Sequence, residues 1–184
     1  MNFPTFLTLL RILVIPLLVA IYYLPIENKY LICAGLFGIA ALTDWLDGFL
    51  ARRWNQTTPF GAFLDPVADK LMVAVALGVL IEAHASWILT LPALVIIGRE
   101  IVISALREWM AELGKSANVA VSWLGKVKTT FQMLSIFLLL LAPPGELIAW
   151  AGLGVLYVAA FLTLWSMYSY LRAAKPYLVP SAAK

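Results

Sequence analysis

The chain has 184 residues, of which 63% are hydrophobic and only 12% are charged. Soluble domains are about half apolar and about a quarter charged, so one water-soluble core of this size could not bury the apolar excess. The net charge of +3 needs no nucleic-acid partner, because no basic run with interleaved aromatic residues occurs. We therefore expect one integral membrane domain over residues 1–184.

Six apolar segments, each long enough to cross a bilayer, follow one another along the chain. They cover residues 4–25, 30–53, 66–84, 86–110, 119–142 and 146–172, and Pro, Gly or charged residues occupy the breaks. The first segment lacks a basic start and a cleavage site, so we interpret it as a span and not as a signal peptide. The predicted fold class is an all-α membrane protein, a bundle of six transmembrane helices.

Lys and Arg residues gather on one side of this arrangement. The termini and the even-numbered connections hold most of them, whereas Lys29 stands alone in the odd-numbered connections. Cytoplasmic loops of membrane proteins are enriched in Lys and Arg. The bias therefore predicts that both termini and the connections at 52–65 and 108–119 face the cytoplasm.

Several ionisable residues lie inside or beside the predicted spans. Each charge at the middle of a membrane helix costs about 2.5–3.5 kcal/mol, and such groups usually line a functional cavity. The predicted topology brings all of them to the cytoplasmic halves of the spans. They are Arg11, Asp44, Asp47, Asp65, Asp69, Lys70, Arg99, Glu100 and Arg107, with Lys126 and Lys128 at the start of the fifth span. The pattern predicts one polar cavity that opens to the cytoplasm.

Four aspartates form the acidic part of this cavity. Asp44 and Asp47 share one helix face at i, i+3, and Asp65 and Asp69 share another at i, i+4. Carboxylates this close together need a cation, and oxygen ligands without His or Cys favour one or two Mg²⁺ or Mn²⁺ ions. Asp65-Pro66 also fits the N-cap and first residue of the third span, so capping alone is an alternative for Asp65.

The basic residues of the cavity suit an anionic co-substrate. A metal site, a phosphate and a ring of cations together favour phosphoryl-type transfer, in which positioning and charge neutralisation supply most of the catalysis. Two simpler interpretations stay open. Arg107 and Lys128 could anchor helix ends among headgroups, and Arg99 could pair with Glu100 internally.

The stretch from Asp44 to Asp69 resembles the CDP-alcohol phosphotransferase signature D-x2-D-G-x2-A-R-x8-G-x3-D-x3-D at every fixed position. Those positions are Asp44, Asp47, Gly48, Ala51, Arg52, Gly61, Asp65 and Asp69. The N-terminal stretch from Asn2 to Arg11 is similar to the family motif N-x-P-N-x-L-T-x-x-R, with Thr5 at the second Asn. The segments 98–107 and 125–129 resemble members whose acceptor is glycerol 3-phosphate.

The resemblance implies a six-helix bundle in the bacterial inner membrane, commonly a homodimer, with a cytoplasmic active site. The implied reaction transfers the phosphatidyl group of CDP-diacylglycerol to sn-glycerol 3-phosphate, giving phosphatidylglycerophosphate and CMP. Residue by residue, it implies metal ligands at Asp44, Asp47, Asp65 and Asp69, with Asp69 also the catalytic base. It implies contacts to CDP-diacylglycerol from Asp47, Gly48, Ala51, Arg52 and Gly61. Candidates for binding glycerol 3-phosphate are Arg11, Arg99, Arg107, Lys126 and Lys128.

Other functions are compatible with parts of the sequence. A sister enzyme could use phosphatidylglycerol, inositol phosphate or serine as its acceptor. Close helix packing is an alternative role for Gly48 and Ala51. A divalent-cation transporter would also place carboxylates in the membrane, but the outer halves of the spans offer no acidic path. A membrane prenyltransferase would carry D-x-x-x-D motifs in a longer chain.

Overall fold

The structure is a computed structural model that describes residues 3–54, 58–114 and 123–178. Within these ranges, the side chains at 3–5, 45, 47–54, 62, 123–124, 176 and 178 lie outside the description. Among these are residues predicted to bind the metal or CDP-diacylglycerol, namely Asp47, Gly48, Ala51 and Arg52.

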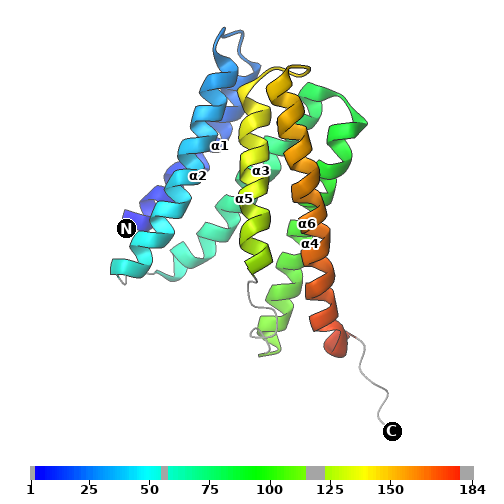
Figure 1. Cartoon of the computed structure of the whole chain (residues 1–184). Coiled ribbons are helices and arrows are strands. Elements are labelled where there is room, and N and C mark those ends of the chain that lie inside the picture. The colour runs from blue at the N-terminus through cyan, green and yellow to red at the C-terminus, as the bar shows by residue number, and fades with distance from the viewer. Residues whose placement is uncertain (1–2, 55–57, 115–122, 179–184) are drawn as a thin grey trace.

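The described residues form six α-helices that run alternately up and down, which confirms the predicted all-helical architecture (Figure 1). The start of α1 and the end of α6 lie toward the same end of the bundle, which we call the terminal end. The helices are α1 (Phe3–Tyr23), α2 (Lys29–Trp54), α3 (Pro59–His84), α4 (Trp87–Glu112), α5 (Trp123–Leu141) and α6 (Leu147–Leu178).

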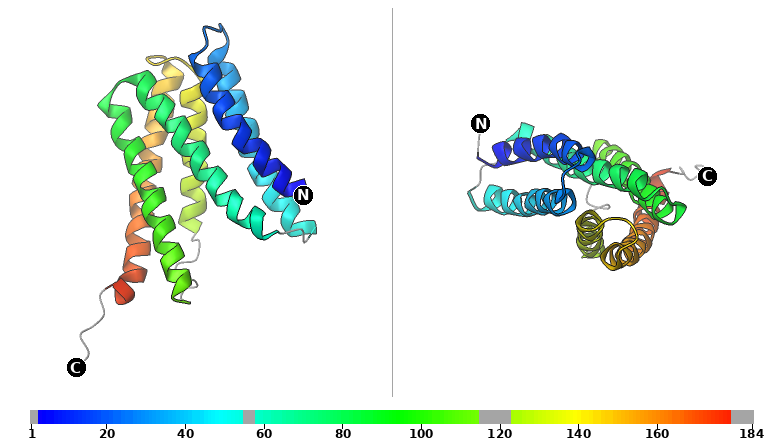
Figure 2. Two further views of the ribbon diagram at one scale, coloured as in Figure 1. Left: turned by 180° about the vertical axis from the view of Figure 1, so that it is seen from behind. Right: turned by 90° about the horizontal axis from the view of Figure 1, so that it is seen from above.

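Helix α3 begins seven residues earlier than predicted. Thr58 is its N-cap and accepts a hydrogen bond from the Gly61 N–H at 3.0 Å, while Pro59 occupies the first turn. The predicted start at Asp65-Pro66 is therefore wrong, because Thr58-Pro59 provides the same start signal earlier. Pro66 lies inside the helix, where it cannot donate a backbone hydrogen bond. The first turns of α3 curve away from α4 (Figure 2), as an internal proline explains.

Helix α1 packs against α2 and α3, and α6 packs against α4 and α5. Helix α5 also contacts α2, which closes the bundle. The main core is aliphatic and aromatic, with Phe37, Leu77, Ile96 and Leu156 no more than 1% exposed. Helices α5 and α6 approach closely at Gly152, whose carbonyl accepts a hydrogen bond of 2.8 Å from the Ser135 hydroxyl. Small residues allow such close approach between membrane helices.

Three of the helices are long and apolar enough to cross a membrane, judged over the described residues. These segments are Phe6–Tyr23 in α1, Trp87–Glu112 in α4 and Leu147–Lys175 in α6. Large hydrophobic side chains such as Leu13, Leu42 and Phe161 point outward and are more than half exposed. A surface of this kind requires lipid around it, so the chain is a membrane protein.

Candidate active site

The carboxylates of Asp44 and Asp69 meet at the terminal end of the bundle. Asp44 comes from α2 and Asp69 from α3, and the guanidinium of Arg11 on α1 lies between them. Arg11 Nη1 is 2.7 Å from Asp44 Oδ1 and 2.5 Å from Asp69 Oδ1. The two carboxylate oxygens are therefore within about 5 Å of each other, although they belong to different helices. Arg11 is 1% exposed, whereas the two carboxylates reach solvent.

Helix α1 also holds the third described aspartate. Thr8 lies one turn before Arg11, and its hydroxyl donates a 2.6 Å hydrogen bond to Asp65 Oδ1. Thr8 is fully buried. One face of α1 therefore contacts carboxylates from both α2 and α3. The side chain of Asp47, the fourth predicted ligand, lies outside the described residues.

The described carboxylates suit a hard divalent cation in their chemistry. Asp44 and Asp69 converge on one positively charged nitrogen, and every ligand atom they offer is oxygen. Among the described residues, no group of three acidic, His or Cys side chains forms a metal cluster. The metal site therefore stays a prediction, supported by the convergence of two carboxylates and by the family signature.

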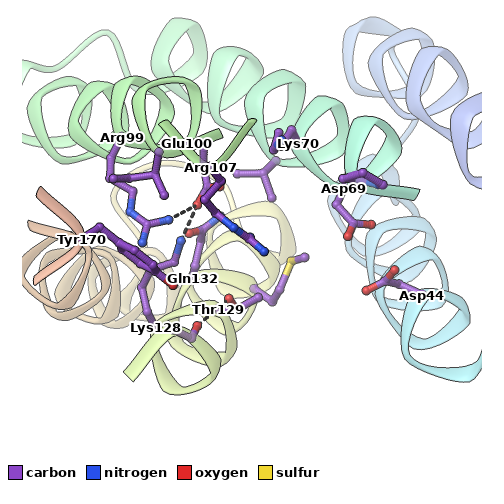
Figure 3. A pocket seen from close by; sticks show the side chains of 15 residues that line it. Asp44, Asp69, Lys70, Arg99, Glu100, Arg107, Lys128, Thr129, Gln132 and Tyr170 are labelled. Atoms are coloured by element: carbon purple, nitrogen blue, oxygen red, sulfur yellow. Dashed lines mark hydrogen bonds and ion pairs between the residues drawn. The ribbon is translucent and has the colours of Figure 1, made fainter. Parts of the chain in front are cut away.

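A cavity of about 290 Å³ joins these carboxylates to basic residues (Figure 3). Asp44 and Asp69 lie on one side of it, and Arg99, Arg107 and Lys128 lie on the other. Helices α2 to α6 all contribute to its lining. Its polar lining residues are Asp44, Asp69, Lys70, Arg99, Glu100, Arg107, Lys128, Thr129, Gln132 and Tyr170.

The basic side of the cavity is anchored by Glu100. Its Oε1 atom accepts a hydrogen bond from Lys128 Nζ and lies 3.5 Å from Arg99 Nη1. Arg99 also donates a 2.7 Å hydrogen bond to the Ser166 hydroxyl and stacks 5.5 Å from the centre of the Tyr170 ring. Arg99 and Lys128 are 8% and 4% exposed, so both cations are fixed in a mostly dry site. The internal Arg99–Glu100 pair is present, and the same arginine lines the cavity.

The predicted glycerol-phosphate residues separate into three environments. Arg99, Arg107 and Lys128 line the cavity, and Arg107 is exposed at its rim. Arg11 contacts the carboxylates and is absent from the described lining of this cavity. Lys126 is exposed and lines a neighbouring groove. Only three of the five predicted residues therefore share the basic side.

The neighbouring groove, between α2 and α5, is larger and more apolar. Its volume is about 660 Å³, and Phe37, Leu42, Leu134 and Phe137 lie in its wall. Asp44, Gly125, Thr129 and Met133 line both the groove and the polar cavity. The two spaces are therefore neighbours that meet along the wall formed by these four residues.

Four polar residues of the site were given no role from the sequence. Thr8, Ser166, Tyr170 and Gln132 each contact a predicted site residue or line the cavity. A signal was available for two of them, since Thr8 and Gln132 lie one turn from Arg11 and Lys128 on the same helix faces. Ser166 and Tyr170 lie on α6, where the sequence offers only a polar residue in an apolar run.

Of the residues predicted to contact CDP-diacylglycerol, only Gly61 has described surroundings. Gly61 is buried in the first turn of α3, where its N–H completes the helix cap. Its position supports a role in shaping the beginning of α3. Gly48, Ala51 and Arg52 belong to the last turns of α2, next in sequence to Asp44.

In this helical membrane protein, two carboxylates face basic side chains across one cavity. This arrangement is the one expected of a membrane enzyme that transfers a phosphate-linked group. The family model described as CDP-alcohol phosphatidyltransferase matches residues 1–165. The chain belongs to the CDP-alcohol phosphatidyltransferase family.

Individual bacterial relatives are similar over almost their whole length. The CDP-diacylglycerol–glycerol-3-phosphate 3-phosphatidyltransferase of Pectobacterium atrosepticum is 60% identical over 174 residues, which cover 95% of each chain. The protein of the same name from Sodalis glossinidius is 59% identical and that from Escherichia coli K12 is 58% identical, each over at least 95% of both chains.

Proposed function

We propose that this chain transfers the phosphatidyl group of CDP-diacylglycerol to sn-glycerol 3-phosphate, releasing phosphatidylglycerophosphate and CMP. The similarity to relatives with this activity covers 95% of the chain. The observation that carries the proposal is the single cavity in which Asp44 and Asp69 face Arg99, Arg107 and Lys128. A reaction between a diphosphate and a phosphorylated alcohol needs both kinds of surface in one place.

The basic side of the cavity binds the acceptor phosphate. Lys128 and Arg99 are held by Glu100, so their charges are in place before the acceptor arrives. Arg107 at the rim adds donors that can reach phosphate from solvent. This arrangement favours a phosphorylated acceptor over serine, which carries no phosphate, or over a bulky phospholipid.

The acidic side activates the acceptor alcohol. Asp69 takes the proton from the C1 hydroxyl, and the resulting oxygen attacks the β-phosphorus of the lipid substrate. Arg11 holds the Asp69 carboxylate in place and fixes its distance from Asp44. The direct displacement requires no covalent intermediate, because no Ser, Cys or His side chain among the described lining residues faces the cavity. Arg52, by resemblance, binds the diphosphate.

Asp44, Asp47, Asp65 and Asp69 would hold one or two Mg²⁺ or Mn²⁺ ions. When bound, such an ion would neutralise the diphosphate and the charge that develops on the CMP leaving group. The protein's own contribution is to bring carboxylates of α2 and α3 together and to fix them through Thr8 and Arg11.

The groove between α2 and α5 suits the lipid substrate. Its apolar wall can accept an acyl chain, and its border with the polar cavity places the headgroup beside Asp44. Lys126 at this groove can contact a lipid phosphate instead of the acceptor. CDP-diacylglycerol can thus reach the site sideways from the inner leaflet.

The cellular arrangement follows from the same proposal. All six helices cross the bacterial inner membrane, the termini and the active site face the cytoplasm, and the protein is a homodimer. The charge bias of the connections supports the orientation.

The decisive experiment measures CMP release from CDP-diacylglycerol by the full chain, with and without glycerol 3-phosphate and Mg²⁺. We expect release only when both are present. A parallel panel with phosphatidylglycerol, inositol phosphate and serine tests the sister activities, and a higher rate with any of them would refute the proposed acceptor. A cation transporter would instead give metal flux into vesicles without CMP.

A further inference from the structure

Gln132 is a buried polar residue of the cavity whose side-chain oxygen has no hydrogen-bond partner among the described residues. It lies on α5, is 3% exposed and lines the cavity that holds Asp69 and Lys128. Its Oε1 atom is buried, and no hydrogen-bond partner for it exists among the residues that the structure describes. No motif in the sequence includes it.

An unpaired amide is unfavourable in a folded core. Leaving a buried hydrogen-bonding group unsatisfied costs about 1–3 kcal/mol, so buried polar side chains normally have a partner. Other buried polar residues of α5 follow this rule, since Ser135 donates to the Gly152 carbonyl and Lys128 to Glu100. Gln132 lines the ligand cavity, so a ligand bound there can approach its amide, whose oxygen has no other partner among the described residues.

The chemistry of the amide restricts what that partner can be. A carboxamide carries no charge and offers both a hydrogen-bond acceptor and donors. A phosphate is better served by the neighbouring Lys128 and Arg99. An alcohol, which also donates and accepts, matches the amide on both counts. A ketone oxygen could only accept, and a methylene group could do neither.

The position on α5 indicates which alcohol. Gln132 lies one turn after Lys128 on the same helix face, about 6 Å further along the axis. Figure 3 places both on the side of the cavity opposite Asp44 and Asp69. An acceptor that sets its phosphate on Lys128 and extends its reacting hydroxyl to Asp69 crosses the cavity that Gln132 also lines, which brings the carbon between these two groups into the reach of Gln132.

We propose that Gln132 determines acceptor specificity by hydrogen bonding to the C2 hydroxyl of glycerol 3-phosphate. This inference rests on the proposed function and deepens it. The acceptor is then held at three points: its phosphate by Lys128 and Arg99, its C1 hydroxyl by Asp69, and its C2 hydroxyl by Gln132. Three fixed points around a chiral carbon distinguish mirror images, so the same residue selects the sn-3 enantiomer.

The test compares kcat/KM for three acceptors in the full-length enzyme: sn-glycerol 3-phosphate, its sn-1 enantiomer, and 3-hydroxypropyl phosphate, which lacks only the C2 hydroxyl. The kcat/KM of the wild-type enzyme should be about tenfold or more higher for the natural acceptor than for each analogue, because the loss of one buried hydrogen bond changes kcat/KM by about this factor. In Gln132→Met, which keeps the volume and removes the amide, both preferences should fall to within about twofold of unity. The KM for CDP-diacylglycerol should not change.

Ser135→Ala is the matched control, because it removes a buried polar group of the same helix outside the cavity. It should lower thermal stability and leave both preferences unchanged. Should Gln132→Met fail to fold, Gln132→Asn withdraws the amide by one methylene and tests the same contact. Preferences retained in a folded Gln132 variant would overturn the inference while leaving the proposed reaction intact. A wild-type enzyme that releases no CMP with any of the three acceptors would refute both.

Discussion

Arg11 gives the sharpest test of how the acidic side is built. We expect Arg11→Met to destabilise the protein, because it removes the cation between two carboxylates and keeps much of the side-chain volume. Breaking a buried ion pair by removing one partner costs about 3–5 kcal/mol. Here the Asp44 and Asp69 side chains are 33% and 40% exposed, so water compensates part of the lost contact. We therefore expect the free energy of unfolding to fall by about 2–3 kcal/mol.

The assay is thermal unfolding of the full chain in detergent micelles, followed by intrinsic tryptophan fluorescence. For a chain of this size, the expected loss lowers Tm by roughly 5–10 °C. Arg11→Lys should recover part of the shift, since a single nitrogen of Arg11 contacts both carboxylates. Arg172→Met is the matched control, because Arg172 is exposed on α6 and its loss should change the free energy of unfolding by less than about 0.5 kcal/mol.

A divalent cation adds a second arm to this test. With Arg11 removed, Mg²⁺ can supply the positive charge that Asp44 and Asp69 have lost. Mg²⁺ should therefore raise the Tm of Arg11→Met by more than it raises the Tm of the wild-type protein. A variant with an unchanged Tm, or with the same Mg²⁺ response as the wild type, would refute the role of Arg11 as counter-ion to these aspartates.

Three further changes test separate parts of the structure. Asp69→Asn keeps an oxygen for Arg11 but cannot take a proton, so kcat should fall by at least about 100-fold while CDP-diacylglycerol still binds; normal turnover would end its assignment as the base. Arg99→Ala should raise the KM for glycerol 3-phosphate by about tenfold or more and should raise the KM for CDP-diacylglycerol far less. An equal rise in the two KM values would argue against a separate phosphate pocket. Gly152→Ala would place Cβ 2.9 Å from Leu139 Cγ and should lower the free energy of unfolding by about 1–3 kcal/mol. Gly154→Ala is the control, because open space surrounds Gly154, and equal Tm values for the two variants would contradict the close packing of α5 and α6.

The helical architecture could be predicted because apolar runs of this length leave few alternatives in lipid. Most helix ends lie close to the predicted ones, where Pro, Gly or charged residues break the runs. The start of α3 was predicted wrongly because two Thr/Asp-Pro pairs, Thr58-Pro59 and Asp65-Pro66, carry the same local signal. Only the packing of the preceding turns against the bundle decides between them.

The acidic site was predictable as a set, and its contacts were not. Spacing places Asp65 and Asp69 on one helix face, but it does not say which neighbouring helix that face meets. Arg11 was therefore predicted to bind the acceptor phosphate, whereas the structure places it against Asp44 and Asp69. A charge in an apolar span shows that a partner exists, and only the packing of helices identifies it.

The basic site shows the same division. Lys128 and Arg99 were named from the sequence, but the shared Glu100 oxygen that joins them depends on how α4 and α5 are rotated. Gln132 gave no signal of its own, because a single glutamine in a membrane helix is compatible with several roles. Its burial and missing partner emerge only from the assembled bundle.

The position of Arg11 on the first helix has a consequence for biogenesis. A ribosome completes α1 before it starts α2 and α3, so the cation is synthesised ahead of the carboxylates it neutralises. Helices that carry Asp44 or Asp69 would enter lipid at a cost if alone, and we expect Arg11, which contacts both carboxylates in the folded protein, to lower that cost. Chain order thus assists assembly, and glycosylation-mapping of α3 insertion should show less insertion when α1 carries Arg11→Met.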